Sequence, residues 1–202
     1  MALLDRFRQP VWKHPDRSVR ATAVQELNAD EQEALASVAR DDPDPAIRRI
    51  ALRKLDDFEL LGETARRDPD ESVRDEARDI LLTTALEAKD VGGGAAALSQ
   101  LNESKALLLV AKSAGLEPVS HSALSRLLQL NDRKALVSVA SHANHVTTRL
   151  AALEGIVEPD DLTAIATKSE YQDVAIAAIN RITDHDLLEA VATRARQKAA
   201  AR

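Results

Sequence analysis

Three pairs of an aspartate and an arginine, each four residues apart, are the part of this 202-residue sequence whose residue types and spacing could do chemistry. The pairs are Asp16 with Arg20, Asp44 with Arg48, and Asp70 with Arg74. Each Asp stands where a helix N-cap is expected, and each Arg follows one turn later. Three parallel guanidinium groups could clamp a phosphate or a carboxylate. The acids beside each Arg argue against such a clamp and favour a structural role.

The remaining polar side chains form no set that indicates catalysis, a cofactor or a metal. His142 and His145 are three apart in an expected turn, but no acid or Cys completes a ligand set, so we expect surface histidines. The paired acids Asp56-Asp57 and Asp160-Asp161 precede expected helices, where the helix dipole favours negative charge. We therefore expect a protein that is not an enzyme and holds no cofactor and no metal.

Composition limits the functional class further. The chain has no Cys, 2% aromatic residues and a net charge of −6. Nucleic-acid binders normally need a basic stripe and often stacking rings, so we do not expect nucleic acid as the partner. The sequence shows neither a secretory signal nor an apolar run of membrane-spanning length, which predicts a cytoplasmic protein with no membrane partner. The oligomeric state stays open.

Two apolar patterns recur along the chain and are locked together. The first, Leu-x-x-(Val/Ile/Thr)-Ala, occurs six times and predicts the first helix of a hairpin. The second has an apolar or small residue, Ala four later and Leu or Ile eight later, and predicts the second helix. The Ala of the first pattern precedes the opening of the second by eight residues in all five complete pairs: 39 to 47, 65 to 73, 111 to 119, 140 to 148 and 166 to 174. This regularity predicts a repeated helical hairpin with Ala at the helix crossings.

The repeat breaks once, near residues 82–106. We expect the helix that begins at Glu71 to run to about Lys89 and to be broken by Gly92–Gly94, either as a hinge or as an irregular turn. This divides the chain into an N-terminal block, 1–90, and a C-terminal block, 91–202, continuous as one array. The first block has 15 basic and 21 acidic residues, and the second has 12 of each.

The ends of the chain differ from its middle. Leu3, Leu4 and Phe7 suggest a short N-terminal helix that covers the first repeat. At the other end, Leu188–Ala192 reads as a first helix, and its second helix would open at position 200. We therefore expect the array to continue in a longer protein, or its last helix to pack on a partner or a second copy.

The motif Pro-Asp-x-x-(Val/Ile)-Arg, followed by Ala and Leu, resembles the short bacterial HEAT repeat of phycobilin-lyase-type (PBS-lyase-type) proteins. It occurs at residues 15–20, 43–48 and 69–74, and becomes looser after Gly94. The whole pattern also resembles the N-terminal helical-repeat segment of bacterial proteins that carry domain of unknown function 349. The resemblance implies an all-α, right-handed α-solenoid of about six HEAT-like hairpins. It also implies that Asp16, Arg20, Asp44, Arg48, Asp70 and Arg74 form a ladder between repeats.

Such a solenoid usually holds another macromolecule along one long face. The leading expectation is thus a non-catalytic interaction scaffold that binds a protein partner. The alternatives are a nucleic-acid-binding or DNA-glycosylase-like protein and a bilin-lyase-like protein. The nucleic-acid alternative would need a basic surface, and one second helix has a basic cluster: Arg48, Arg49, Arg53 and Lys54. Five Asp residues flank this cluster in the sequence, which argues against that use.

Overall fold

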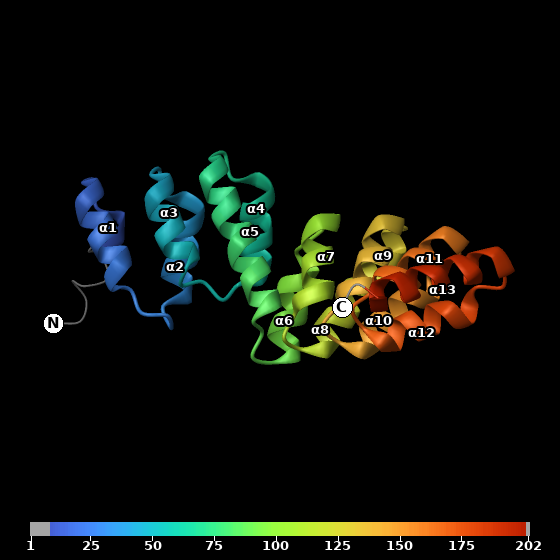
Figure 1. The fold of residues 1–202 in the computed structure, drawn as a ribbon. Helices are drawn as coiled ribbons and strands as arrows, with labels where there is room; N and C mark the ends of the chain where they lie inside the picture. The colour runs from blue at the N-terminus through green and yellow to red at the C-terminus, as the bar shows by residue number, and fades with distance from the viewer. Residues whose placement is uncertain (1–8, 201–202) are drawn as a thin grey trace. The chain divides into compact units, whose positions relative to one another are not determined.

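The computed structural model describes residues 9–200, and all the regular structure in this range is helical (Figure 1). The helices are η2 (Val11–Lys13), α1 (Arg17–Glu26), α2 (Gln32–Asp41), α3 (Pro45–Leu52), α4 (Phe58–Arg67), α5 (Glu71–Leu86), α6 (Val91–Ser99), α7 (Ser104–Ser113), α8 (Glu117–Leu130), α9 (Arg133–His142), α10 (Val146–Glu154), α11 (Pro159–Lys168), α12 (Gln172–Arg181) and α13 (His185–Ala200). The N-terminal helix expected around Leu3–Phe7 lies outside the described residues.

Aspartate side chains begin several of these helices. Asp16 accepts hydrogen bonds from the backbone N–H groups of Ser18 and Val19 at the start of α1. Asp44, Asp57, Asp90 and Asp132 cap α3, α4, α6 and α9 in the same way. Each side chain satisfies an N–H group that has no partner within its own helix, which fixes where the helix starts.

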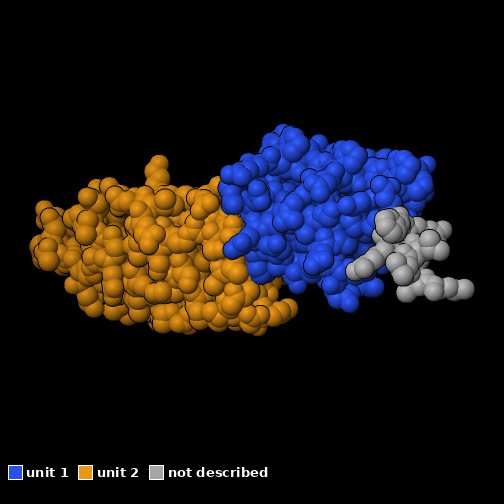
Figure 2. All heavy atoms as spheres, turned by 180° about the vertical axis from the view of Figure 1, so that it is seen from behind, with its two compact units in different colours: residues 1–83 blue, residues 84–202 orange. Residues whose placement is uncertain are grey.

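Contacts between Cα atoms divide the chain into two units, with the boundary inside α5 (Figure 2). Unit 1 ends at Thr83 and unit 2 begins at Thr84. In unit 1, α3 packs against α2, its hairpin partner, and against α1, the second helix of the preceding repeat. The side chain of Arg78 on α5 donates to the carbonyl of Ala65 on α4, which joins those two helices.

Unit 2 is built from two rows of helices (Figure 1). The first helices α7, α9, α11 and α13 form one row, in which each contacts the next. The second helices α6, α8, α10 and α12 form the other row in the same manner. The hairpins α7–α8, α9–α10 and α11–α12 join the rows, so the predicted all-helical hairpin repeat is confirmed.

The repeated Leu and Ala positions lie inside these packed helices. Leu35, Leu61 and Leu107 of the first pattern are fully buried. The six Ala residues of the second pattern from α3 onward are also fully buried: Ala51, Ala77, Ala97, Ala123, Ala152 and Ala178. A small side chain at this point lets two helix backbones approach closely, so the Ala spacing matches the helix contacts.

The irregular repeat corrects one expectation, because Gly92–Gly94 begin a helix and do not break one. α5 ends at Leu86, and α6 starts at Val91 with Asp90 as its N-cap. The interruption falls at residues 87–90, and α6 follows α5 with no first helix between them. Asp90 secures the glycine-rich turn by accepting from the Gly93 N–H at 2.8 Å. Capping thus outweighs the weak helix propensity of glycine.

Gly94 also has a packing reason to lack a side chain. A Cβ atom there would lie 2.7 Å from Ala88 Cβ and 2.7 Å from Val119 Cγ2. Glycine therefore allows the start of α6 to contact α8 closely. Among the described residues, no helix combines the length and apolar character needed to cross a bilayer.

Candidate binding surface

The three predicted arginines of unit 1 belong to one network, but their acidic partners are Asp42 and Asp68 and not the predicted capping aspartates. Arg20 forms a two-pronged ion pair with Asp42, with Nε–Oδ2 and Nη2–Oδ1 distances of 2.8 and 3.2 Å. Arg48 binds Asp68 in the same way, at 2.9 and 2.7 Å. Each pair joins one repeat to the next, because the arginine and the acid lie in successive hairpins.

Each arginine also donates to a backbone carbonyl six residues before it. Nη1 of Arg48 donates to the Asp42 carbonyl at 2.9 Å, and Nη1 of Arg74 donates to the Asp68 carbonyl at 2.7 Å. Asp42 and Asp68 therefore accept from two successive arginines, one through the carboxylate and one through the backbone. The result is a chain of contacts from Arg20 through Asp42, Arg48 and Asp68 to Arg74, which leaves the guanidinium groups of Arg20 and Arg48 occupied by carboxylates.

The capping aspartates have separate partners. Hydrogen bonds from Ser18 and Ser72 are the main cause of the lowered pKa values of Asp16 and Asp70. The pKa of Asp44 is lowered first by its hydrogen bond with Arg17. These three carboxylates thus hold the helix starts.

Asp42 and Asp68 were missed from the sequence, although a local signal marks them. Each is the first Asp of an Asp-Pro-Asp triplet and the C-cap residue of a first helix. Each carboxylate also accepts from the N–H group two residues later, at 2.9 Å in both cases. The six-residue spacing from the first Asp of the triplet to the next Arg is the signal that could have identified Asp42 and Asp68 as acceptors.

Unit 2 replaces most of this network with other polar contacts. Ser120 stands where the Arg is expected, and its hydroxyl donates to the Ala111 carbonyl at 2.6 Å and lies 3.1 Å from the Thr148 hydroxyl. Arg149 keeps the arginine role, with Nη2 2.7 Å from Asp173 Oδ2 and the guanidinium carbon 3.8 Å from the centre of the Tyr171 ring. Every buried side-chain N or O atom of the described residues has a hydrogen-bond partner.

A second series of contacts joins successive second helices at their C-terminal ends. Lys54, Arg126 and Arg181 each lie three residues after the Ala of the second pattern. This spacing was not predicted from the sequence. Each donates to the carbonyl that follows the corresponding Ala of the preceding second helix: Val24, Leu98 and Leu153. Each cation thereby contacts the C-terminal end of the neighbouring helix, where the helix dipole favours positive charge.

The basic cluster on α3 and in the two residues after it has no free cation. Arg48 binds Asp68, and Lys54 binds carbonyls at the end of α1. Arg49 and Arg53 both bind Glu76 on α5, with closest N–O distances of 2.8 and 2.6 Å. The hydrogen bond from Arg53 is the main cause that lowers the pKa of Glu76 to about 2, with Arg49 adding to it and partial burial opposing it.

We expect this cluster to make stability depend on acid pH. The folded pKa of Glu76 is below its ordinary value of 4.5, so its contribution is present above pH 4.5 and is lost as pH falls toward 2. Between pH 5 and pH 2 the wild type should lose more unfolding free energy than Glu76→Gln, because only the wild type has a carboxylate to protonate. The difference should be only about 1 kcal/mol, since water screens the ion pairs with the half-exposed arginines. Urea unfolding of both proteins across this range measures the difference, and parallel curves would contradict it.

The two histidines of interest do not converge on a metal site. His142 is the exposed last residue of α9, whereas His145 is the N-cap residue before α10, with its Nε2 atom 2.9 Å from the Ala114 carbonyl oxygen. Within the described part of the chain, no three His, Asp or Glu side chains are grouped as a metal would require.

Exposed aliphatic side chains concentrate in unit 2. Seven of the eight large ones among the described residues lie there, and only Val11 lies in unit 1. We call Leu128, Leu130 and Val157, with exposed fractions of 39, 53 and 74%, the turn-end patch. Leu128 approaches Gly155, where an added Cβ would lie 2.7 Å from Leu128 Cδ2.

A hollow of about 280 Å³ adjoins the turn-end patch. Val157, Ile156 and Leu136 supply its apolar lining, and Asn131 lies in the turn that follows Leu130. The Arg133–Asp161 ion pair lies at its edge. The patch therefore presents aliphatic surface bordered by paired charges, an arrangement suited to contact with another protein.

Comparison with known proteins gives no assignment. No protein-family model matches the chain, and no curated protein matches its sequence.

Proposed function

We propose that this protein is a non-catalytic scaffold that binds a protein partner, and that the turn-end patch of unit 2 is the main contact. The observation that carries the proposal is a set of three exposed aliphatic side chains at one hollow. Val157 lines the hollow, Leu128 approaches Gly155 in its lining, and Leu130 precedes Asn131 in its lining. Grouped exposed aliphatic residues with a polar border are typical of interaction sites, whereas single ones are ordinary. A HEAT-like repeat in a right-handed solenoid and a bacterial cytoplasmic location belong to the same proposal.

The arrangement of polar groups supports binding in preference to catalysis. The Asp and Arg residues with the most suggestive spacing are used to join repeats and to cap helices. The cations that a nucleic-acid surface would need on α3 are held by Asp68, Glu76 and backbone carbonyls. The basic cluster of unit 1 therefore gives no support to the nucleic-acid alternative.

A capture experiment with variants tests the proposal. The full chain, immobilised, is exposed to native cell extract, and bound proteins are quantified by mass spectrometry. The double variant Leu130→Gln/Val157→Gln should recover at least one partner about tenfold less well than the wild type, because two aliphatic contacts are lost.

The matched control is Val11→Gln/Val91→Gln, which makes the same change at exposed valines outside the patch. This control should retain the partner at the wild-type level. Equal recovery by all three proteins, or no protein above background, would exclude the patch as the main contact. Titration with labelled duplex DNA at low salt gives the second readout, since binding that weakens steeply with salt would favour the nucleic-acid alternative.

A further inference from the structure

A basic groove lies between two first helices of unit 2, beside the turn-end patch. Helices α9 and α11 enclose a hollow of about 320 Å³. Its basic lining consists of Lys134 and His142 on α9 and Lys168 on α11. Ser138 and Ser141 add polar groups, and no acidic side chain lines it.

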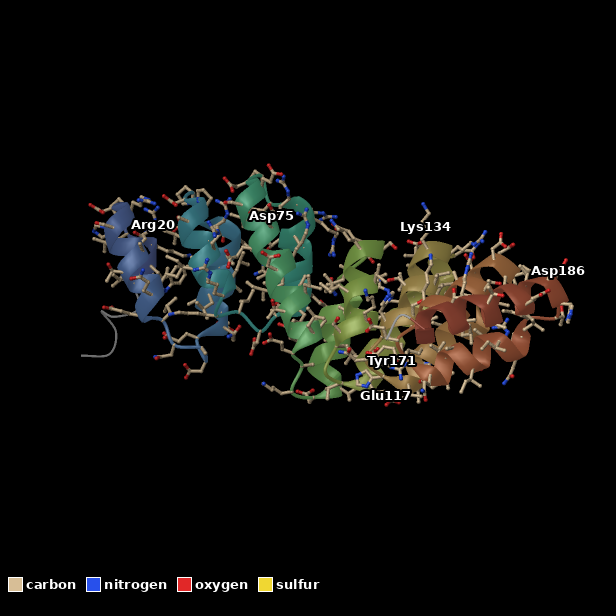
Figure 3. The ribbon with its side chains drawn as sticks, in the orientation of Figure 1. Arg20, Asp75, Glu117, Lys134, Tyr171 and Asp186 are labelled. Carbon is tan, nitrogen blue, oxygen red and sulfur yellow. The ribbon has the colours of Figure 1, made fainter. Side chains whose placement is uncertain are left out.

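The bases of this groove make no direct ion-pair contact among the described residues. Lys134, His142 and Lys168 form no ion pair with any residue that the structure describes. Lys134 extends from the start of α9 away from the helices (Figure 3). The carboxylate nearest to it in sequence, Asp132, is held by the Ser104 hydroxyl and by the Ala135 N–H group, and it interacts with Lys134 through charge without an ion-pair contact. Lys134 and Lys168 therefore give the groove a positive charge.

Helix dipoles explain only part of this charge. His142 and Lys168 lie in the last turns of their helices, where a base is favourable on any helix. Lys134 is different, because it lies in the first turn, where the dipole favours an acid. The residues at the same position of the other first helices, apart from Lys105 on α7, are acids: Glu33, Glu59, Asp160 and Asp186. Lys134 thus gives up a local stabilisation and adds a base to the groove.

Unit 1 provides a contrast at the corresponding positions. On α4 the residues that match Ser138 and His142 are Glu63 and Arg67, which form an ion pair of 3.3 Å. The same surface of unit 1 is therefore neutralised internally. On α9 the acid is replaced by Ser138, and His142 Nδ1 lies 3.1 Å from the Ser138 carbonyl oxygen. The bases of α9 are therefore not neutralised by an acid on their own helix.

We propose that the groove binds an acidic segment of the protein partner through its carboxylate side chains. The inference rests on the proposed function and names the chemistry of the partner. Eight residues separate Lys134 from His142, so the bases span about 12 Å along α9. About four residues of an extended peptide cover that distance. This spread fits several carboxylates along a peptide better than one tetrahedral phosphate.

The groove and the turn-end patch adjoin each other at the start of α9. Arg133 lies at the hollow beside the patch, and Lys134 lines the groove. A segment that crosses both surfaces carries an aliphatic residue at the patch and acidic residues along α9. The partner's binding segment therefore has an aliphatic residue that contacts the turn-end patch, next to acidic residues that contact the groove.

A peptide selection tests the chemistry directly. A library of random twelve-residue peptides is selected on the full chain, and selected sequences should be enriched in Asp and Glu together with an aliphatic residue. The affinity of one selected peptide is then measured by fluorescence anisotropy at low salt. Lys134→Gln/Lys168→Gln should weaken it about tenfold, with a smaller loss at high salt. The matched control is Lys105→Gln/Lys112→Gln on α7, which should bind as the wild type does.

Three outcomes would overturn the inference. The first is a selection that gives no binder, or only neutral and basic peptides. The second is a Lys134→Gln/Lys168→Gln variant that binds the peptide as tightly as the control does. The third is complete displacement of the peptide by inorganic phosphate at low millimolar concentration. Failure here is distinguishable from failure of the proposed function. If Leu130→Gln/Val157→Gln loses the captured partner while Lys134→Gln/Lys168→Gln retains it, the patch remains the contact and only the groove assignment is wrong.

Discussion

Replacing Arg48 with alanine is expected to lower the free energy of unfolding by about 3–5 kcal/mol. Arg48 is 6% exposed, and its guanidinium group binds the Asp68 carboxylate through two N–H groups and the Asp42 carbonyl through a third. The substitution removes three hydrogen bonds and leaves the Asp68 carboxylate buried without its countercharge. Urea unfolding followed by circular dichroism measures the loss.

The control for this prediction is Arg67→Ala in the same unit. Arg67 is 78% exposed and pairs with Glu63 on the surface, so its removal should change stability by less than about 1 kcal/mol. The variant Asp68→Asn and the double variant Arg48→Ala/Asp68→Asn complete a cycle, in which the two losses should not add. A loss below about 1 kcal/mol for Arg48→Ala, or additive losses, would mean that the ion pair does not hold the repeats together.

Enlarging a crossing alanine is expected to produce the next largest effect. Ala152 on α10 is fully buried, and α10 contacts α8, α9 and α12. Leucine at this position must displace packed side chains or separate the helices, which should cost about 1–3 kcal/mol of unfolding free energy. Ala51→Leu on α3 of unit 1 makes the same change at the same place in the repeat and should cost a similar amount.

Exposed alanines supply the comparison for this second prediction. Ala96 is an exposed residue of α6, and leucine has nearly the same helix propensity as alanine, so Ala96→Leu should leave stability almost unchanged. Guanidinium unfolding curves of the three variants provide the measurement. Neutral results at Ala51 and Ala152 would show that the Ala spacing reflects composition and not helix packing.

Most of the helical architecture could be predicted from the sequence, because each repeat contains two apolar patterns, one for each helix of the hairpin. Leu107 and Ala111 mark one first helix, and Val119 and Ala123 mark the second helix after it, all of them buried. Helical periodicity and a constant turn length therefore agree at every hairpin. The capping role of Asp16 could also be predicted, because an N-cap hydrogen bond joins residues that are neighbours in sequence.

The features that were missed depend on contacts between segments distant in sequence. Asp42 read as one acid in an acidic turn, and only the folded chain brings it to Arg20, 22 residues earlier. Gly94 read as a helix breaker because propensity is a local property, whereas the close approach of Val119 and capping by Asp90 decide the outcome. The groove at Lys134 was missed because a surface Lys has no signal in sequence until a neighbouring helix supplies the second wall.

The way Asp42 and Asp68 accept from two arginines has a consequence for how unit 1 opens. Each of these acids serves two hairpins at once, through its side chain toward the preceding repeat and through its backbone toward its own. If one hairpin separates, the arginine of its predecessor loses its carboxylate, and a buried charge is left uncompensated in a part that is still folded. Partial opening is then unfavourable at both borders of the separated hairpin. We therefore expect the repeats of unit 1 to exchange their amide hydrogens as a single cooperative block instead of fraying one after another.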